Sequence, residues 1–457
     1  MTQSDATTFD TSSNATRSSL KTSRRRFLGT AAAGAGLTIL PSGFLSGRNA
    51  PSNKLNIAII GAAGRGRAHF GAAKGENVVA LCDVNKRALA SAAKTFSKAK
   101  HYSDWRKCLD QKDVDAVICS TTDFTHAFIA NWALNRGYHI YMEKPLANTV
   151  EEARIAQANF QKQKSKVCTQ VGTQRHAHPN FNRVREAVLD GAVGTLKHVH
   201  AWGNRQIRRK GYLPAAGDPP SHLDYDLWLS LSRWHPYNGG YFGGCLAWNM
   251  YWDFGSGQIG DMGSHVMDLA WNAIDAGLPT SAAAHGEAYN PDITPVDLTA
   301  TFEHPANKWR PEIKLTWYQG AHKPKTLGDD IDVSKIGHGV LFEGDKGYVV
   351  SDFGRMRLVP KDKSKGMAHY KPRPKEKQIP NMGGFQQQWV KACKSDLKTS
   401  CDFDYSGTAI EQMLLGLVAY RAGKKIEYDG KTGRVTNNAE ANGFLGREYR
   451  KGWVIDG

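Results

Sequence analysis

The sequence predicts an α/β protein made of two folded units. The first is a parallel sheet flanked by helices, and the second is an α+β unit with a mostly antiparallel open sheet. Two observations support this prediction: short apolar runs alternate with helical stretches over residues 51–175, and runs of alternating polarity dominate residues 176–457. The 457 residues suffice for two or three folded units, and residues 1–50 stand apart as a polar leader.

The chain is basic, with a formal net charge of +17. Such a charge can attract nucleic acids or acidic ligands, but no zinc-finger spacing or dense basic helix accompanies it. We therefore expect a generally basic surface and no nucleic-acid partner. Seven cysteines occur without any C-x-x-C pair, so a disulfide framework is not expected and no metal site is predicted.

Residues 1–50 have the features of an export signal. Arg24, Arg25 and Arg26 precede a short apolar segment, residues 29–40, in an order that resembles a twin-arginine signal peptide. The apolar segment is shorter than the ~20 residues that span a bilayer, so no stable membrane insertion is predicted. We expect export to the periplasm by the twin-arginine machinery. The alternative is a basic, disordered N-terminus of a cytoplasmic protein.

The folded part begins with a predicted strand over residues 55–60, which runs directly into a glycine-rich turn. A glycine lets the chain turn tightly off a strand, and the start of the following helix then offers free N–H groups to a pyrophosphate. Alanine replaces the usual middle glycine. The turn predicts a dinucleotide-binding loop made of Gly61, Ala63, Gly64, Arg65 and Gly66.

A second predicted strand, residues 77–82, ends at Asp83. The spacing from the glycine turn is typical of the ribose-binding acid of a Rossmann unit, because a carboxylate at this strand end accepts the ribose hydroxyls. Asp83 favours NAD over NADP, since it repels a 2′-phosphate. Lys86 and Arg87 follow closely and could bind such a phosphate, so NADP remains possible.

Three further strands are expected at residues 114–120, 139–142 and 167–171, with helices over residues 123–136 and 150–164. Ligands of such sheets bind beyond the carboxyl ends of the strands. The side chains that follow those ends are therefore predicted to face the nucleotide, namely Thr121, Thr122, Asp123, His126, Glu143 and Lys144.

Taken in order, these motifs resemble one family. The glycine turn, Glu143-Lys144-Pro145 after a late strand, and Gly260-Asp261-Met262-Gly263-Ser264-His265 downstream resemble the Gfo/Idh/MocA oxidoreductases. These are NAD(P)-dependent enzymes that act mostly on sugars and cyclitols. The resemblance implies catalytic roles for Lys144, Asp261 and His265. It also places Gln174 and Arg175 where the chain of such proteins crosses between domains, which makes both candidate substrate contacts.

The three catalytic candidates suit the oxidation of a secondary alcohol. Histidine titrates near neutral pH, so His265 can accept the hydroxyl proton, and Lys144 offers a positive charge beside the oxygen. Asp261 lies four residues before His265, which on a helix puts both on one face, so its carboxylate could orient the ring or hold Lys144. The structural alternative is that Asp261 caps a helix and that the other two are ordinary loop and helix residues.

The C-terminal unit is predicted from strand-like runs at residues 196–201, 298–303 and 313–318 and from a partly helical stretch over residues 386–421. In the family that the sequence resembles, this sheet covers the nicotinamide with one face and often forms oligomers with the other. We therefore expect a homo-oligomer, either a dimer or a tetramer.

Ten tryptophans and tyrosines gather between Trp202 and Trp252. Aromatic faces stack on the C–H faces of sugar rings, which makes Trp248 and Tyr251 candidate substrate contacts. Most of the ten are expected to fill the core or a subunit interface, where aromatic residues are also common.

The leading functional hypothesis is an exported NAD(P)-dependent dehydrogenase that transfers hydride between a nicotinamide cofactor and a secondary hydroxyl. Its substrate would be a small carbohydrate: a sugar, a sugar derivative or a cyclitol. One alternative is a glycoside-cleaving enzyme that uses NAD only transiently, for oxidation, elimination and a second reduction. The other is a catalytically silent sugar-binding protein. The presence of Lys144, Asp261 and His265 together argues against that reading.

Overall fold

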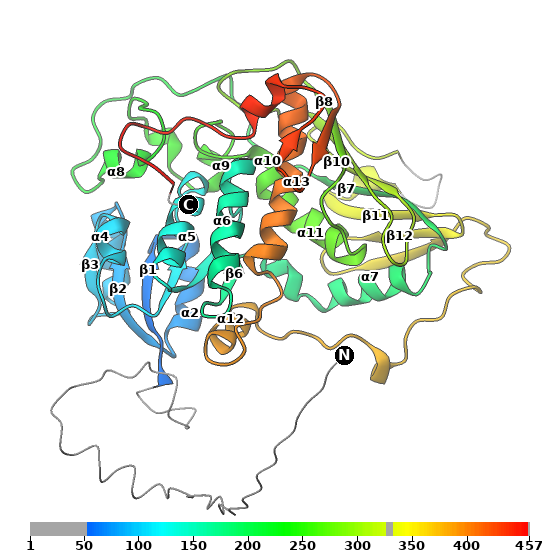
Figure 1. Cartoon of the computed structure of the whole chain (residues 1–457), viewed down its shortest axis with the longest axis horizontal. Coiled ribbons are helices and arrows are strands. Elements are labelled where there is room, and N and C mark those ends of the chain that lie inside the picture. Colours follow the sequence, from blue (N-terminus) through cyan, green and yellow to red (C-terminus); the bar gives the residue numbers. More distant parts are fainter. Residues whose placement is uncertain (1–52, 326–331, 456–457) are drawn as a thin grey trace, which may run out of the picture. The chain divides into compact units, whose positions relative to one another are not determined.

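Six parallel strands form the N-terminal sheet, in the order β3-β2-β1-β4-β5-β6 (Figure 1). The computed structural model describes residues 53–325 and 332–455. The strand order reverses between β1 and β4, which is the topology of a Rossmann fold and confirms the prediction. The strands are β1 (Asn56–Ile60), β2 (Asn77–Cys82), β3 (Lys100–Tyr102), β4 (Ala116–Cys119), β5 (His139–Met142) and β6 (Thr169–Val171).

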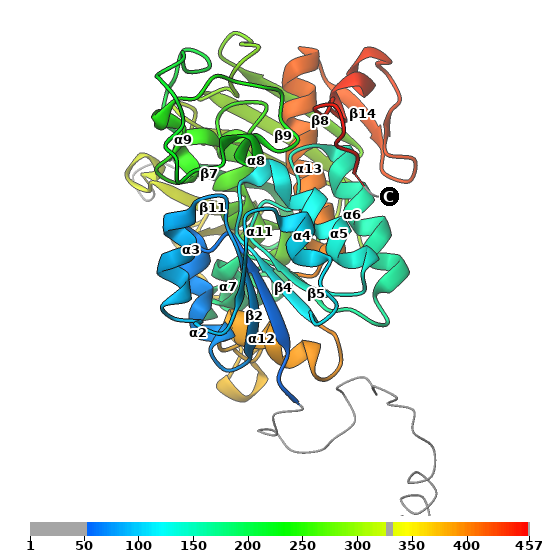
Figure 2. The same ribbon diagram turned by 90° about the vertical axis from the view of Figure 1, so that its left-hand side faces the viewer.

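Successive residues of a strand point to opposite faces of the sheet, and helices pack on both faces, so both are buried. Ala58 and Ile60 belong to the core that includes residues of the helices on one face, α4 (Trp105–Leu109), α5 (His126–Asn135) and α6 (Val150–Gln163). Ile57 and Ile59 pack on the other face with α3 (Lys86–Ala93) and α12 (Phe385–Cys393). Figure 2 shows α3 and α5 on opposite sides of the strands.

The second half of the chain contributes to the core of the first sheet. Phe385 and Trp389 of α12, together with Cys401, are buried in the same cluster as Ile57 and Ile59. The prediction of helical residues over 386–421 is confirmed by α12 and by α13 (Phe403–Ala422). From Lys54 onward the chain is one compact unit, so the two sheets share a continuous packed interior.

The second sheet has nine strands in the order β13-β12-β11-β7-β10-β9-β8-β14-β15. Among the described residues every neighbouring pair is antiparallel except β7 with β10, so the prediction of a mostly antiparallel sheet is confirmed. The strands are β7 (Leu196–Gly203), β8 (Ser281–Gly286), β9 (Leu298–His304), β10 (Ile313–Gln319), β11 (His338–Gly344), β12 (Gly347–Ser351), β13 (Met356–Pro360), β14 (Ile426–Asp429) and β15 (Arg434–Val435).

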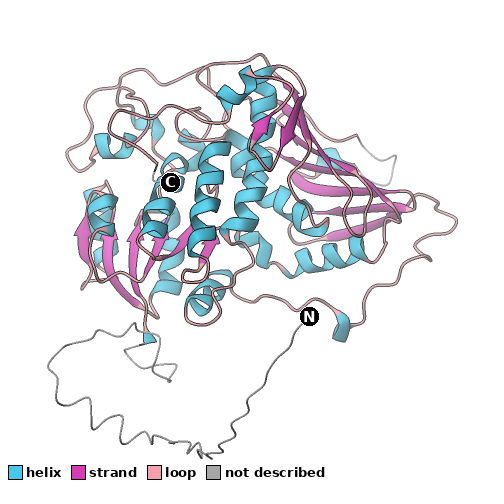
Figure 3. Ribbon diagram, in the orientation of Figure 1, coloured by secondary structure: helices cyan, strands magenta, loops and turns pink. Residues whose placement is uncertain are grey.

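Helices lie against one face of the nine-stranded sheet, namely α7 (Pro179–Leu189), α11 (Gly263–Ala273) and α13. α13 also packs along α6, so this helix pair lies between the two sheets (Figure 3). No helix in the described part of the chain is long and apolar enough to cross a bilayer. The predicted export signal, residues 1–50, lies outside the described residues. All seven cysteines are free, and six of them are buried.

Arg447 fastens the C-terminal segment to the first unit. Its guanidinium pairs with Glu152 in the first turn of α6 at 2.7 Å and also donates to the backbone oxygens of Phe124 and Asp253. Glu152 is completely buried. A buried carboxylate that loses its partner keeps the full cost of its desolvation. Through these contacts Arg447 holds together the segments that contain Phe124, Glu152 and Asp253.

We expect Arg447→Met to destabilise the protein by about 3–5 kcal/mol, because Glu152 would be left buried with too few donors. The midpoint of urea unfolding, followed by tryptophan fluorescence, measures the change. Arg450→Met is the matched control, since Arg450 pairs with the exposed Asp226 and such a pair contributes about 1 kcal/mol or less. Equal midpoints for the two variants would contradict the role given to Arg447.

Candidate active site

The glycine turn follows β1 where the strand order reverses. Gly61 has a φ of +80°, and a Cβ there would lie 2.4 Å from the carbonyl oxygen of Ser120, just after β4. A Cβ at Gly66 would lie 1.9 Å from the carbonyl oxygen of Gly61. Both positions therefore require glycine. Ala63 has an extended backbone with a φ of −108°, so the alanine introduces no backbone strain.

The segment after the turn differs from the expected helix. It starts as the 3₁₀ helix η2 (Gly64–His69) and continues as only four residues of α-helix, α2 (Phe70–Ala73). Gly66 N donates to the carbonyl of Ala63 three residues back at 2.8 Å, which sets the tighter winding. The amides of Gly64 and Arg65 open this helix and are available to an anion.

Asp83 follows β2 and holds the glycine turn in place. One of its carboxylate oxygens accepts a hydrogen bond from the amide of Ala62 and the other from the amide of Asn85, each at 2.9 Å. Burial raises the pKa of Asp83, and these backbone bonds oppose the shift. Each oxygen keeps a second lone pair, so the carboxylate can still accept ribose hydroxyls.

A segment of the second half closes over the same region. Residues 222–224 pair with residues 84–86 through backbone hydrogen bonds of 2.8 and 2.9 Å. Leu227 and Trp228 follow and form a wall of the cavity that lies beyond the strand ends. Residues 222–228 therefore cover the end of the cavity that is lined by Asp83.

Lys86 and Arg87, which could bind the 2′-phosphate of NADP, lie outside this cavity. Neither Lys86 nor Arg87 lines it, and the amide of Lys86 is already bonded to the carbonyl of His222. Asp83 is the charged side chain of β2 and its following loop that faces the cavity. This arrangement favours NAD.

Glu143 follows β5 and contacts donors from two other segments, η2 and the turn at Gln174. Its carboxylate accepts from Arg65 Nε at 2.8 Å and from Gln174 Nε2 at 2.6 Å, and it lies 2.9 Å from His69 Nε2. Burial acts to raise the pKa of Glu143, but His69 and Arg65 outweigh it and lower the pKa to about 2. Glu143 therefore stays ionised and links the glycine turn to the end of β5.

Lys144, the next residue, pairs with a different element. Its ammonium forms a buried ion pair with the carboxylate of Asp261 in α10 (Gly257–Asp261). Burial acts to lower the pKa of Lys144, but Asp261 and Asp123 raise it above its usual value. Burial acts to raise the pKa of Asp261, and Lys144 holds it below its usual value. Both groups therefore remain charged.

His265, in the first turn of α11, faces the same cavity. Its Nδ1 is buried without a hydrogen-bond partner in the described part of the chain, as is Oδ2 of Asp261. Asp261 thus holds Lys144 and does not orient the histidine ring, which decides between the two roles expected for it. Burial and the charge of Lys144 lower the pKa of His265 to about 3, so its ring is neutral.

Asp123 lies at the same strand end as Thr121 and Thr122 and faces the cavity, as the sequence predicted. It follows β4, is 4% exposed, and lines the cavity beside Lys144. Burial raises its pKa well above the ordinary value, although the charge of Lys144 opposes the shift. The neighbouring carboxylates of Asp261 and Glu143 add to it.

These groups surround a cavity of about 730 Å³. The predicted catalytic residues Lys144, Asp261 and His265 all line it. So do ten predicted cofactor contacts: Gly61, Ala63, Gly64, Arg65, Asp83, Thr121, Thr122, His126, Glu143 and Lys144. Gly66 lies beneath the loop, where it permits close packing against Gly61.

Of the predicted substrate contacts, Gln174, Arg175 and Trp248 line the cavity and Tyr251 does not. Tyr251 is fully buried and stacks on Tyr212 with ring centroids 5.2 Å apart. Its place in the aromatic segment suggested a sugar contact, but packing among neighbouring rings accounts for it. The expectation for Tyr251 is therefore corrected.

A dinucleotide fits the residues of this cavity. Its volume is typical of cofactor pockets, which span ~300–1,000 Å³. Beside the glycine turn, the hydroxyl of Ser120 is buried and has no hydrogen-bond partner among the described residues. The amides of Gly64 and Arg65 would hold the pyrophosphate, and Asp83 would hold a ribose. Fold and site together define a protein with a dinucleotide-binding Rossmann fold.

Comparison with known proteins gives the family. The model of an oxidoreductase family with an NAD-binding Rossmann fold matches residues 55–172, and the C-terminal α/β domain of the same family matches residues 210–455. The chain belongs to the Gfo/Idh/MocA oxidoreductase family, as its motifs predicted.

Two characterised relatives are dehydrogenases. Levoglucosan dehydrogenase of Pseudarthrobacter phenanthrenivorans is 28% identical over 244 residues, 50% of this chain and 54% of the relative. Inositol 2-dehydrogenase of Salmonella paratyphi B is 33% identical over 128 residues, 28% of this chain and 38% of the relative. The chain therefore spans about half, or less, of the length of these relatives.

Solved structures share the fold. The WlbA dehydrogenase from Bordetella pertussis, in complex with NADH and UDP-GlcNAcA, aligns with a TM-score of 0.58 at 18% identity over 82% of this chain and 98% of that chain. Levoglucosan dehydrogenase in complex with NADH and L-sorbose aligns with a TM-score of 0.55 at 17% identity, over 82% of this chain and 98% of that chain.

We expect Gly66→Ala to weaken NADH binding by about tenfold or more and to destabilise the fold by ~1–3 kcal/mol, because the added methyl would displace the carbonyl of Gly61. Fluorescence titration with NADH and the thermal midpoint measure the two effects. Gly71→Ala is the control, since a Cβ there meets open space in α2. Wild-type NADH affinity in Gly66→Ala would show that the turn does not bind the nucleotide.

Proposed function

We propose that this protein is an NAD-dependent dehydrogenase that transfers hydride between the cofactor and a secondary hydroxyl of a sugar, sugar derivative or cyclitol. One observation carries the proposal: Lys144, Asp261 and His265 meet in the cavity that also contains the glycine turn and Asp83. The levoglucosan and inositol dehydrogenases among the relatives support a carbohydrate substrate.

Lys144 polarises the substrate oxygen in this mechanism. Its ammonium is fixed by Asp261, and the raised pKa of Lys144 keeps it protonated. A positive charge in a partly buried cavity stabilises an oxygen that loses its proton more strongly than the same charge does in water. The ammonium therefore favours the alkoxide-like state of the hydroxyl.

His265 receives the hydroxyl proton. Its pKa of about 3 keeps the ring neutral, so a nitrogen lone pair is free to accept. Lys144 acidifies the substrate hydroxyl, and its charge, together with burial, keeps the resting ring of His265 neutral. A nicotinamide cofactor, when bound, supplies the hydride acceptor.

We expect His265→Ala to lower kcat by ~10²–10⁴-fold, the usual contribution of a positioned general base, with NADH affinity unchanged. Stopped-flow absorbance of NADH formation gives kcat, and fluorescence titration gives the affinity. His285→Ala on the exposed end of β8 is the control. Near-normal turnover of His265→Ala would make His265 a structural residue.

The pH profile provides a second readout of His265. A histidine with an ordinary pKa of ~6.5 is mostly protonated at pH 5 and would no longer accept a proton. His265, with a pKa of about 3, stays neutral there. We therefore expect kcat at saturating substrate to show no loss centred near pH 6.5, and such a loss would contradict the assignment.

A product assay separates this proposal from its two alternatives. A dehydrogenase accumulates NADH in proportion to oxidised sugar, whereas a glycoside-cleaving enzyme releases a leaving group without net reduction of NAD. A silent binding protein yields neither product. Simultaneous measurement of absorbance and released sugar on the wild-type protein therefore distinguishes all three.

We propose that the protein is exported through the twin-arginine machinery to the periplasm. Replacing Arg24, Arg25 and Arg26 with lysine should retain the folded protein in the cytoplasm, because the signal depends on paired arginine and not on charge alone. Immunoblots of periplasmic and cytoplasmic fractions measure the distribution, with Arg48→Lys as control. Unchanged periplasmic recovery of the triple variant would exclude this route.

We also propose a homo-oligomer formed through the face of the nine-stranded sheet opposite α11. Tyr318 and Tyr348 are partly buried on that face, where they pack on a buried cluster that contains Trp202, Leu341 and Val350. Sedimentation velocity at several concentrations tests the proposal. A monomer throughout would contradict it.

A further inference from the structure

We propose that the substrate carries an anionic oxygen group, a carboxylate or a phosphate, and that Arg175 and Arg205 bind it beside the catalytic residues. The inference rests on the proposed function, since it names the class of carbohydrate that the site accepts. It starts from the balance of charge around the cavity.

The carboxyl groups that line the cavity are already accounted for. Asp83 accepts two backbone amides, Glu143 is held by Arg65, and Asp261 pairs with Lys144. Asp123 lies beside Lys144, which it faces together with Asp261. Among the described residues, none of these carboxylates forms an ion pair with a further cation of the cavity lining other than Lys144 and Arg65.

Arg175 and Arg205 both line the cavity, and neither pairs with a carboxylate within the described ranges. The guanidinium of Arg175 lies 5.0 Å from the ring centroid of Phe353 and contacts His178 Nε2 at 3.3 Å, and neither partner is anionic. Two solvent-exposed guanidinium groups therefore line the cavity, and neither forms an ion pair with a described carboxylate.

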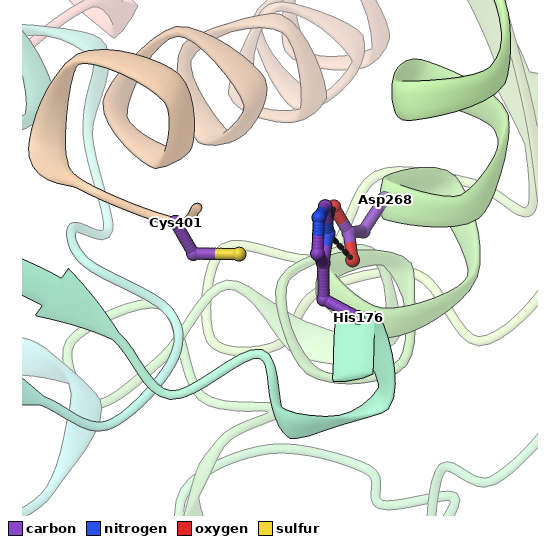
Figure 4. A group of neighbouring side chains, drawn as sticks. All are labelled: His176, Asp268 and Cys401. Atoms are coloured by element: carbon purple, nitrogen blue, oxygen red, sulfur yellow. Dashed lines mark hydrogen bonds and ion pairs between the residues drawn. The ribbon is translucent and has the colours of Figure 1, made fainter. Parts of the chain in front are cut away.

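The position of Arg175 is fixed by its two neighbours in η4 (Gln174–Ala177). Gln174 donates to Glu143 on the cavity side. His176 points the other way and contacts both carboxylate oxygens of Asp268 in α11, at 3.0 and 3.1 Å (Figure 4). Tyr405 donates to the same carboxylate at 2.6 Å. Arg175 is thus held between anchored residues.

The cluster drawn in Figure 4 holds η4 against α11 through the contact between His176 and Asp268. His176, Asp268 and Cys401 place potential metal ligands within 4.8 Å of one another. However, Asp268 already binds His176 and Tyr405, which satisfies the buried carboxylate without a metal ion. His176 and Asp268 therefore act as positioning residues that join η4 to the helix carrying His265.

Arg205 differs from the arginine three residues further along the same segment. Arg208 binds Glu287 at 2.7 Å and Asp297 at 2.8 Å, and it lies outside the cavity lining. Arg205 lines the cavity near Asp261, and its charge helps to lower the pKa of that carboxyl. Arg208 is therefore paired with two carboxylates, whereas Arg205 lines the cavity without an ion pair among the described residues.

The cofactor pyrophosphate does not account for this surplus charge. The glycine turn and the start of η2 provide its donors, and Arg65 stands beside them. Arg175 and Arg205 come from segments that follow β6 and β7, and their charges act on His265 and Asp261. A planar guanidinium binds carboxylate or phosphate through paired hydrogen bonds, which suits an anion on the substrate.

Binding of matched sugars tests the inference without requiring turnover. The probes are glucose, glucuronate and glucose 6-phosphate, together with galactose and galacturonate, each titrated by calorimetry into NADH-loaded protein. We expect at least one anionic sugar to bind tenfold or more tightly than its neutral partner. The carboxylate and phosphate members of the set identify which anion is preferred.

Arg175→Gln and Arg205→Gln should each weaken binding of the preferred anionic sugar by about 10- to 100-fold, the usual effect of losing a charge-assisted hydrogen bond. Binding of the neutral sugar and of NADH should not change. Arg208→Gln, which removes a charge from the same segment but outside the cavity, should bind all probes as the wild type does.

The outcomes separate this inference from the function on which it rests. If the protein binds no NADH, the proposed function fails. If NADH binds but no anionic sugar binds more tightly than its neutral partner, only the anionic class is overturned. If the two variants weaken NADH binding as much as sugar binding, the arginines belong to the cofactor and the inference is also overturned.

Discussion

The ion pair between Lys144 and Asp261 is the interaction on which the site depends. Lys144 follows the fifth strand of the Rossmann sheet, and Asp261 ends a helix of the second half, so the pair joins the two parts of the chain at the cavity. Their side chains are 14% and 1% exposed. A charge at such a depth is tolerated because its partner is present, so the pair fixes how the two halves meet around the substrate.

Much of the first unit could be predicted because its strands are buried on both faces. Such strands appear as continuous apolar runs, and β2 and β5 cover the same residues as the runs at 77–82 and 139–142. Parallel topology then brings the strand ends together. Residues that follow different strands, such as Asp83 and Glu143, can therefore be predicted from the sequence as neighbours of one ligand.

Other features depend on contacts that no local pattern encodes. β3 is a three-residue strand with two exposed positions, so it has no apolar run. His69 lies buried against Glu143, 74 positions away, and no spacing rule links them. The cover over Asp83 forms because residues 222–224 pair with residues 84–86, an interaction between two loops. The aromatic composition of that segment suggested sugar contacts, but Tyr251 turned out to pack among other rings.

Both halves of the chain contribute residues to the lining of the cavity. The Rossmann half supplies the glycine turn, Asp83 and the ammonium of Lys144 to the lining of the cavity. The second half supplies Asp261, His265 and Arg205. One cation links the two sets, because Lys144 holds Asp261 ionised and adds to the effect of burial that keeps His265 neutral. Arg205 of the second half also helps to lower the pKa of Asp261, so substitutions there can affect the ion pair as well as the wall of the cavity.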